Sequence, residues 1–138
     1  MDDLLIKLRY KDQSRIAVIN APVEFEKRIS KMLPEVQIDK DINARFLYEF
    51  MVVFATGSEK VRELGPSCLH NLSNDGKLWI AYPKGTSKKY NSDITRDRGW
   101  EPVEEGGFKR VSQVGIDDDW SALRFRNVKY VKSVKKEQ

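Results

Sequence analysis

Residues 84–97, KGTSKKYNSDITRD, form the stretch whose residue types are best suited to hold a ligand. They follow the apolar segment LWIAYP, so we expect them to lie at the carboxyl end of a strand, where α/β proteins commonly bind phosphates and cofactors. Ammonium groups and clustered backbone N–H groups both attract anions. The candidate anion-binding residues are Lys84, Gly85, Thr86 and Ser87, with Asn20 at the end of an earlier strand.

Two acidic residues extend this candidate site. Asp93 and Asp97 are four residues apart, so they would share one face of the helix that we expect to begin near Ser92. With Asn20 and Lys84 they could form the polar centre of an enzyme at the strand ends. A structural interpretation stays open beside it: Asp93 would stabilise a helix N-terminus, and Asp97 would pair with an arginine or a lysine.

The strands that would position these residues are short segments with apolar or alternating composition. The predicted strands are 16–19, 36–39, 50–55, 78–82, 108–116 and 120–128. The runs at 50–55 and 78–82 have no polar alternation, which is typical of parallel strands covered on both faces. The last two segments alternate and are close together in the chain, which predicts an antiparallel hairpin. Asn74-Asp75-Gly76 is expected to form a tight turn into the strand at 78–82.

Apolar residues at helical spacing predict helices at 25–33 and 58–72, and a partly helical segment at 92–105. Gly65-Pro66 interrupts the second of these, so we expect a kink or two short helices in tandem. Residues 4–10 are ambiguous between a strand and a short helix.

The order of these elements predicts an α/β fold. Helices on both faces of a mostly parallel sheet would make a three-layer sandwich, completed by a C-terminal antiparallel hairpin. We expect one domain over residues 1–128 and a basic, frayed tail at 129–138.

Composition and charge exclude several classes of protein. No apolar run approaches the ~20 residues of a membrane span, and the single cysteine rules out an internal disulfide, so we expect a cytoplasmic protein. The formal net charge is +4, of which the tail supplies +3 through four lysines and one glutamate. The remaining chain is close to neutral, so nucleic acid is not the expected partner.

Four segments resemble a family of small bacterial proteins of unknown function that have a reduced class I methyltransferase-like, Rossmann-like fold. The segments are RIAVINAP, LWIAYPKGTSK, SDITRDRGWEP and VGIDDDWSALRFR, which together cover most of residues 15–126. The resemblance implies a sheet ordered 2-1-3-4-6-5 with the last strand inserted antiparallel. It implies no particular activity.

The same resemblance bears on the methyl donor. Methyltransferases of this class have a glycine-rich turn after the first strand, where the backbone approaches S-adenosylmethionine, and this chain has Asn20-Ala21-Pro22-Val23 there. Asp39 or Asp41 stands where an acidic residue would hold the ribose. Because the glycine turn is missing, we expect no S-adenosylmethionine binding and no cofactor.

Residues that could support other chemistry fit structural roles. Cys68 and His70 are two apart on a predicted helix and point in different directions, so they should form neither a nucleophilic pair nor a zinc site. The aspartates at 117–119 are expected to form a solvated turn, and we predict no metal site.

Two arginines on the last predicted strand need carboxylate partners. Arg124 and Arg126 alternate with Phe125, and an arginine inside a sheet is stable only when it is paired. We expect them to form structural ion pairs with Asp93 or Asp97.

These observations predict a small, non-catalytic binding or regulatory module with a candidate anion site at the 84–97 loop, which would take a small anionic ligand or a protein partner. The alternative is an enzyme of unassigned chemistry at the strand ends. A third hypothesis is a nucleic-acid contact through the basic tail together with Arg124 and Arg126.

Overall fold

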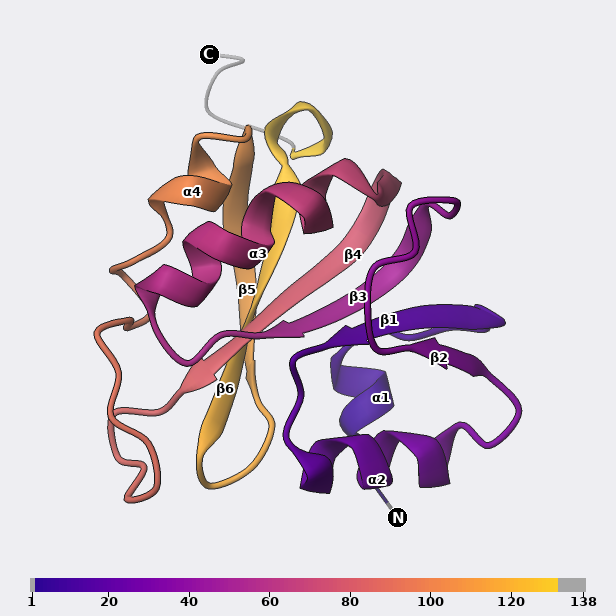
Figure 1. Ribbon diagram of the computed structural model, residues 1–138, viewed down its shortest axis with the longest axis horizontal. Coiled ribbons are helices and arrows are strands. Elements are labelled where there is room, and N and C mark those ends of the chain that lie inside the picture. Colours follow the sequence, from indigo (N-terminus) through magenta and orange to yellow (C-terminus); the bar gives the residue numbers. More distant parts are fainter. Residues whose placement is uncertain (1, 132–138) are drawn as a thin grey trace.

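The computed structural model describes residues 2–131 and contains one six-stranded sheet (Figure 1). The strands are β1 (Arg15–Ile19), β2 (Gln37–Asp39), β3 (Tyr48–Phe54), β4 (Leu72–Pro83), β5 (Phe108–Gly115) and β6 (Trp120–Asn127). Their order is β2-β1-β3-β4-β6-β5, with β2, β1, β3 and β4 parallel and β6 antiparallel to both β4 and β5. The predicted α/β fold, strand order and terminal hairpin are confirmed.

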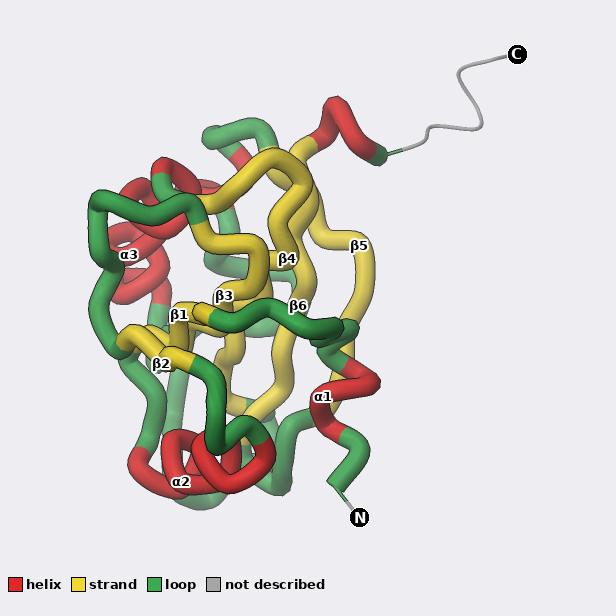
Figure 2. The backbone as a smooth tube through the Cα atoms, turned by 90° about the vertical axis from the view of Figure 1, so that its right-hand side faces the viewer, coloured by secondary structure: helices red, strands yellow, loops and turns green. Residues whose placement is uncertain are grey.

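Helices cover both faces of this sheet (Figures 1 and 2). The helices are α1 (Leu4–Lys7), α2 (Val23–Met32), α3 (Ser58–His70) and α4 (Glu101–Glu104), followed by the 3-10 turn η1 (Val128–Tyr130). The α1 and α2 helices pack on one face and α3 and α4 on the other, so the molecule has three layers. Of the ambiguous N-terminal segment 4–10, residues 4–7 are helical. The N-cap residue Asp3 makes no side-chain hydrogen bond to the helix, and the Asp2 carboxylate accepts from the Leu4 N–H at 3.0 Å.

The central strands carry the core of both faces. In β3 and β4, Val52 and Trp79 pack toward α1 and α2, whereas Val53 and Ile80 pack toward α3 and α4. All four are 3% exposed or less. Because both pleat faces are covered, these strands are apolar without alternation, as the sequence indicated.

The tight turn predicted at Asn74-Asp75-Gly76 is wrong, because β4 runs through these residues as a bulge. The β3 register steps from Tyr48 opposite Leu72 to Phe50 opposite Lys77, so the extra residues of β4 loop out at this point. Asp75 has a φ of 55°, which an aspartate tolerates better than most residues. A Cβ on Gly76 would lie 2.8 Å from the Tyr48 carbonyl oxygen, so the close approach of the strands requires glycine here.

The segment predicted to be partly helical at 92–105 has a single helical turn, α4, and the helix expected to begin near Ser92 does not form. Residues 92–100 form a loop in which Thr95 and Arg98 make an isolated bridge. Gly99 has a φ of 102°, which ends any helix, and the Trp100 indole donates to the Thr95 carbonyl at 2.8 Å. Burial of the Trp100 ring in the α3/α4 core therefore fixes the loop more strongly than the local helical preference does.

Two further expectations have different outcomes. The α3 segment is one helix of 13 residues with Pro66 inside it, not two helices in tandem. Pro66 is exposed and Gly65 is buried. A Cβ built on Gly65 would lie 3.8 Å from the Val103 side chain, so α3 faces α4 at this residue. The predicted frayed tail lies mostly at 132–138, outside the described residues.

Among residues 2–131, no helix has both the length and the apolar character to cross a membrane.

Candidate functional site

The direction of strand order reverses between β1 and β3, and in open α/β sheets ligands bind at the carboxyl ends of the strands beside such a point. Asn20 lies there, directly after β1, with a φ of 61°. Its side-chain Nδ2 donates to the carbonyl oxygen of Phe54, the last residue of β3, at 2.8 Å. Asn20 is thus in the predicted place, but its amide group already links the ends of the two strands.

Asp93 also lies at this edge of the sheet, but in a loop and not in the helix predicted to begin near Ser92. Its carboxylate accepts from the backbone N–H of Ser58 at 2.8 Å and from the Ser58 hydroxyl. The hydrogen bonds from this hydroxyl and this N–H hold the pKa of Asp93 below its usual value. Asp93 therefore stabilises the N-terminus of α3 and does not begin a helix of its own.

The loop that begins at Lys84 is organised around Ser87. The Ser87 hydroxyl donates to the Asp119 carboxylate at 2.8 Å and accepts from the backbone N–H groups of Lys89 and Tyr90, each at 3.1 Å. The Ser87 N–H is also used, because it donates to the Lys84 carbonyl at 3.0 Å. The hydroxyl and the backbone N–H of Ser87 are therefore both used in hydrogen bonds that hold the loop.

The other candidate residues of this loop are more open. Gly85 and Thr86 are exposed, and Lys84 is half-buried with its ammonium group close to Gly115, where a notional Cβ would lie 3.7 Å from Nζ. Lys89 is engaged, since its Nζ lies 3.1 Å from the Glu24 carboxylate in the first turn of α2. This ion pair joins the loop to the helix that follows β1.

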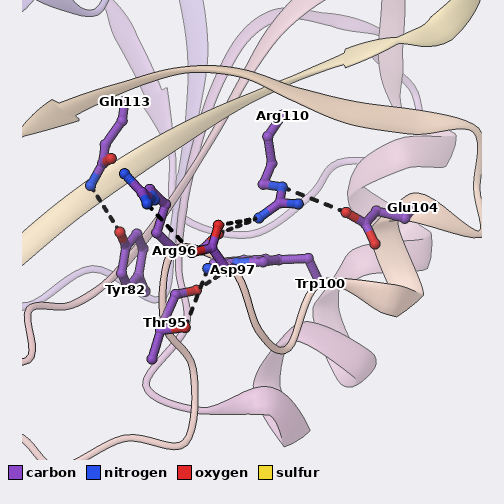
Figure 3. Close-up of polar contacts among 8 residues, drawn as sticks. All are labelled: Tyr82, Thr95, Arg96, Asp97, Trp100, Glu104, Arg110 and Gln113. Carbon is purple, nitrogen blue, oxygen red and sulfur yellow. Dashed lines mark hydrogen bonds and ion pairs between the residues drawn. The ribbon is translucent and has the colours of Figure 1, made fainter.

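Asp97 lies apart from Asp93, because the helix that would have aligned them does not form. Its carboxylate lies 3.3 Å from Arg110 Nη1 on β5. The same arginine donates to the Arg96 carbonyl and lies 3.6 Å from the Glu104 carboxylate on α4 (Figure 3). Arg110 thus fastens the 92–100 loop and α4 to the sheet, and sequence reasoning missed it because its partners come from two separate segments.

Asp39 is fully occupied by neighbouring side chains. It accepts from Arg15 Nε at 2.8 Å, from Gln37 Nε2 at 3.1 Å and from the Tyr48 hydroxyl. Burial raises the pKa of Asp39, but the hydrogen bonds from Arg15, Tyr48 and Gln37 outweigh it and leave the pKa below its usual value. The Arg15 guanidinium also stacks over Phe46, 3.9 Å from the ring centroid.

Neither Arg124 nor Arg126 pairs with Asp93 or Asp97, although Arg126 does form a structural ion pair. Arg126 makes a two-pronged ion pair with Asp75, with Nε and Nη2 each 2.7 Å from a carboxylate oxygen. The bulge in β4 brings Asp75 to this position, which no local sequence pattern indicates. Arg124 has no carboxylate within ion-pair distance among residues 2–131, and its Nε is buried without a hydrogen-bond partner there.

A cavity lies at the other end of the sheet from the predicted site. It has a volume of about 560 Å³ and is bounded by the last turn of α3, the start of β4 and η1, with His70, Leu72, Phe108 and Asn127 in its wall. Asn20, Lys84 and Asp93 line none of the five cavities that the described residues form most clearly. Among residues 2–131, no three histidine, cysteine, aspartate or glutamate side chains lie close enough together to hold a metal ion.

The architecture is that of class I methyltransferase-like Rossmann proteins. The N-methyltransferase NodS from Bradyrhizobium japonicum WM9 is 14% identical, with a TM-score of 0.59 over 90% of this chain and 92% of that one. A ribosomal protein L11 methylase from Lactobacillus delbrueckii subsp. bulgaricus is 12% identical, with a TM-score of 0.54 over 90% of this chain and 75% of that one. An uncharacterized protein from Listeria monocytogenes serotype 4b is 15% identical, with a TM-score of 0.52 over 99% and 73%.

The similarity of this chain to these solved structures shows its fold. No protein-family model matches the chain, and no curated protein matches it at the level of sequence.

Proposed function

We propose that the protein is a non-catalytic binding or regulatory module that uses a methyltransferase-like sheet as its scaffold. The observation that supports this most directly is the self-pairing of polar groups at the strand ends. Asn20 is bonded to the Phe54 carbonyl, and Asp93 is bonded to Ser58. A general base or a substrate-holding group directs a lone pair or a proton at the substrate, whereas Asn20 Nδ2 and both carboxylate oxygens of Asp93 are directed at protein groups.

The proposal includes the loss of methyl-donor binding. NodS has been solved in complex with S-adenosyl-l-homocysteine, so the fold itself accommodates such a ligand. In this chain Pro22 supplies no N–H to the turn after β1, and the Ala21 side chain packs against the α1/α2 core. Asp39 is held by Arg15 and Tyr48 and has no carboxylate oxygen left without a partner.

The 84–97 loop is the proposed place for a small anionic ligand. Lys84 and Lys88 have no carboxylate within ion-pair distance among residues 2–131, and Gly85 and Thr86 are exposed beside them. Two ammonium groups near exposed backbone N–H groups would attract an anion. The helix dipole expected from Ser92 does not contribute, because no helix begins there.

The proposal also includes two expectations from the sequence, one on the family of the protein and one on its location. The segments RIAVINAP and LWIAYPKGTSK support membership of the family of small bacterial proteins that they resemble. A single cysteine that is free and buried supports a cytoplasmic location.

The test is a calorimetric titration of the wild type and Asp39→Asn with S-adenosylmethionine and S-adenosyl-l-homocysteine, with NodS as the positive control. We expect no saturable heat for either form of this protein, while NodS binds. Micromolar affinity in the wild type that is lost in a folded Asp39→Asn variant would overturn the proposal. A backbone amide spectrum of each variant establishes that it is folded.

A further inference from the structure

One part of the sheet face that carries α1 and α2 is strongly basic. We call it the basic face, and it consists of Arg9, Lys11, Lys77, Arg124 and Arg126. Lys77 and Arg124 belong to the same pleat face as Trp79, because Lys77 is two residues before Trp79 on β4 and Arg124 is its partner on β6. The α1 helix covers Trp79, whose indole donates to the Leu8 carbonyl at 2.9 Å. The segment after α1 adds Arg9 and Lys11.

The positive charges of this face exceed its negative charges. Asp75 is the carboxylate whose charge acts on both Lys77 and Arg124, and it is already held by the two-pronged contact from Arg126. Arg124 and Lys77 are half-buried, and neither has a carboxylate within ion-pair distance among the described residues. A half-buried cation without an anionic partner costs free energy, because burial removes water from the charge. A folded protein tolerates that cost where a bound ligand supplies the opposite charge.

Hydrogen-bonding groups at the same place also lack partners. Within residues 2–131, the buried polar side-chain atoms without a hydrogen bond are Arg124 Nε and Ser112 Oγ. Ser112 on β5 is the direct cross-strand partner of Arg124 on β6. An unpaired donor beside an unpaired hydroxyl, on adjacent strands, is an arrangement that an oxyanion would complete.

The cations of the basic face interact with one another. Burial lowers the pKa of Arg124, and the charges of Arg126 and Arg9 lower it further. Burial likewise lowers the pKa of Lys77, followed by the charges of Arg124 and Lys11. An anion placed among these groups would remove repulsion as well as gain attraction.

We propose that the basic face binds the phosphate group of a small ligand, either inorganic phosphate or a phosphate monoester, with Arg124, Lys77 and Ser112 as direct contacts. The planar guanidinium of arginine matches the geometry of phosphate oxygens, and a dianion offsets the uncompensated charges. This site is separate from the 84–97 loop, because that loop follows the other end of β4.

A compact ligand fits this face better than a nucleic acid does. Arg124 and Lys77 are half-buried, whereas backbone contacts to nucleic acid use cations spread over an exposed surface. Stacking platforms for single strands need exposed aromatic rings. The large apolar side chains exposed among the described residues are Ile6, Val23, Leu47, Val111 and Val128, none of which is aromatic.

The test follows the backbone amides of the full chain during titration with inorganic phosphate and, separately, with glycerol phosphate, at constant ionic strength set by chloride. The variants are Arg124→Met, with Lys77→Met as a second variant should the first not fold. Arg62→Met is the matched control, because Arg62 is exposed on α3 across the sheet. A short single-stranded oligonucleotide and a duplex are titrated in parallel.

We expect saturable shifts at residues 77, 112 and 124–126, unchanged in Arg62→Met and weakened about tenfold or more in Arg124→Met or Lys77→Met. If glycerol phosphate binds more tightly than inorganic phosphate, the site is assigned to a phosphate monoester. If the two bind equally, the site is assigned to the free anion. Shifts that are the same in all variants, or that chloride reproduces, would overturn the proposal. Saturation by an oligonucleotide without any by the small phosphates would overturn it as well, and would assign the face to nucleic acid.

Discussion

Asp93 accepts two hydrogen bonds from Ser58, one from the backbone N–H at 2.8 Å and one from the hydroxyl, across 35 residues of sequence. Ser58 is the first residue of α3, and the N-cap position is Gly57, which has no side chain to cap the helix. A notional Cβ on Gly57 would lie 3.1 Å from the Asp93 carboxylate. The loop after β4 therefore supplies the capping carboxylate that the helix lacks in its own sequence.

Replacing Asp93 with alanine should lower the midpoint of thermal unfolding by a few degrees at pH 7, since the α3 N-terminus loses its cap. The folded-state pKa of Asp93 is lowered, so its stabilising effect is complete above the unfolded-state pKa near ~3.9 and is lost as the pH falls further. Thermal melts of wild type and Asp93→Ala should thus converge in strong acid. Equal midpoints at pH 7 would show that the cap contributes nothing.

Replacing Asp75 with asparagine should destabilise the protein by about 1–2 kcal/mol, because Arg126 loses its partner beside other cations. Asparagine also tolerates the φ of 55°, so the change tests charge and not backbone strain. Urea unfolding gives the free energy, and the loss should shrink at high salt. In Arg126→Met the same Asp75 change should have little further effect; an undiminished effect there would contradict the ion-pair explanation.

Replacing Val52 with aspartate should prevent folding. Val52 is 0% exposed in the centre of β3, and an unpaired carboxylate there would cost more than ~4 kcal/mol. The measurement is the yield of soluble protein and the presence of a cooperative thermal transition. Val23→Asp is the control, because Val23 is 60% exposed at the start of α2 and should accept the charge. A folded Val52→Asp variant would contradict the buried position of β3.

Replacing Lys84 with alanine should change the free energy of unfolding by less than ~1 kcal/mol, as is usual for a lysine without an ion-pair partner. If the 84–97 loop holds an anion, phosphate or sulfate should shift the amides of residues 84–95 saturably in the wild type and not in the variant. Uniform, unsaturable shifts in both proteins would make the loop a connection only. Shifts at the basic face should be the same in both.

The thiol of Cys68 should be inert in the folded protein. Cys68 is 1% exposed in the α3/α4 core, and burial raises its pKa to about 12, so almost no reactive thiolate exists at pH 8. A thiol reagent should label it only at the rate at which the protein opens, and at full rate in denaturant. Rapid labelling without denaturant would place Cys68 outside the core.

The sequence by itself determined the scaffold of this protein. Unbroken apolar runs predicted β3 and β4, the alternating segments predicted β5 and β6, and helical spacing predicted α2 and α3. These patterns are local, because the period of side-chain burial along a strand or a helix is written in neighbouring residues. The resemblance to a reduced methyltransferase-like fold supplied the strand order, which the structure confirms.

Only the tertiary structure decided which charged groups meet. Asp93 pairs with Ser58 across 35 residues, and Asp75 pairs with Arg126 across 51. The first depends on a loop that the buried ring of Trp100 holds in a non-helical form, and the second on a bulge in β4. A hydrogen bond between distant segments depends on distances of a few ångströms set by the packing of the whole sheet, and residue spacing along the chain carries no such information.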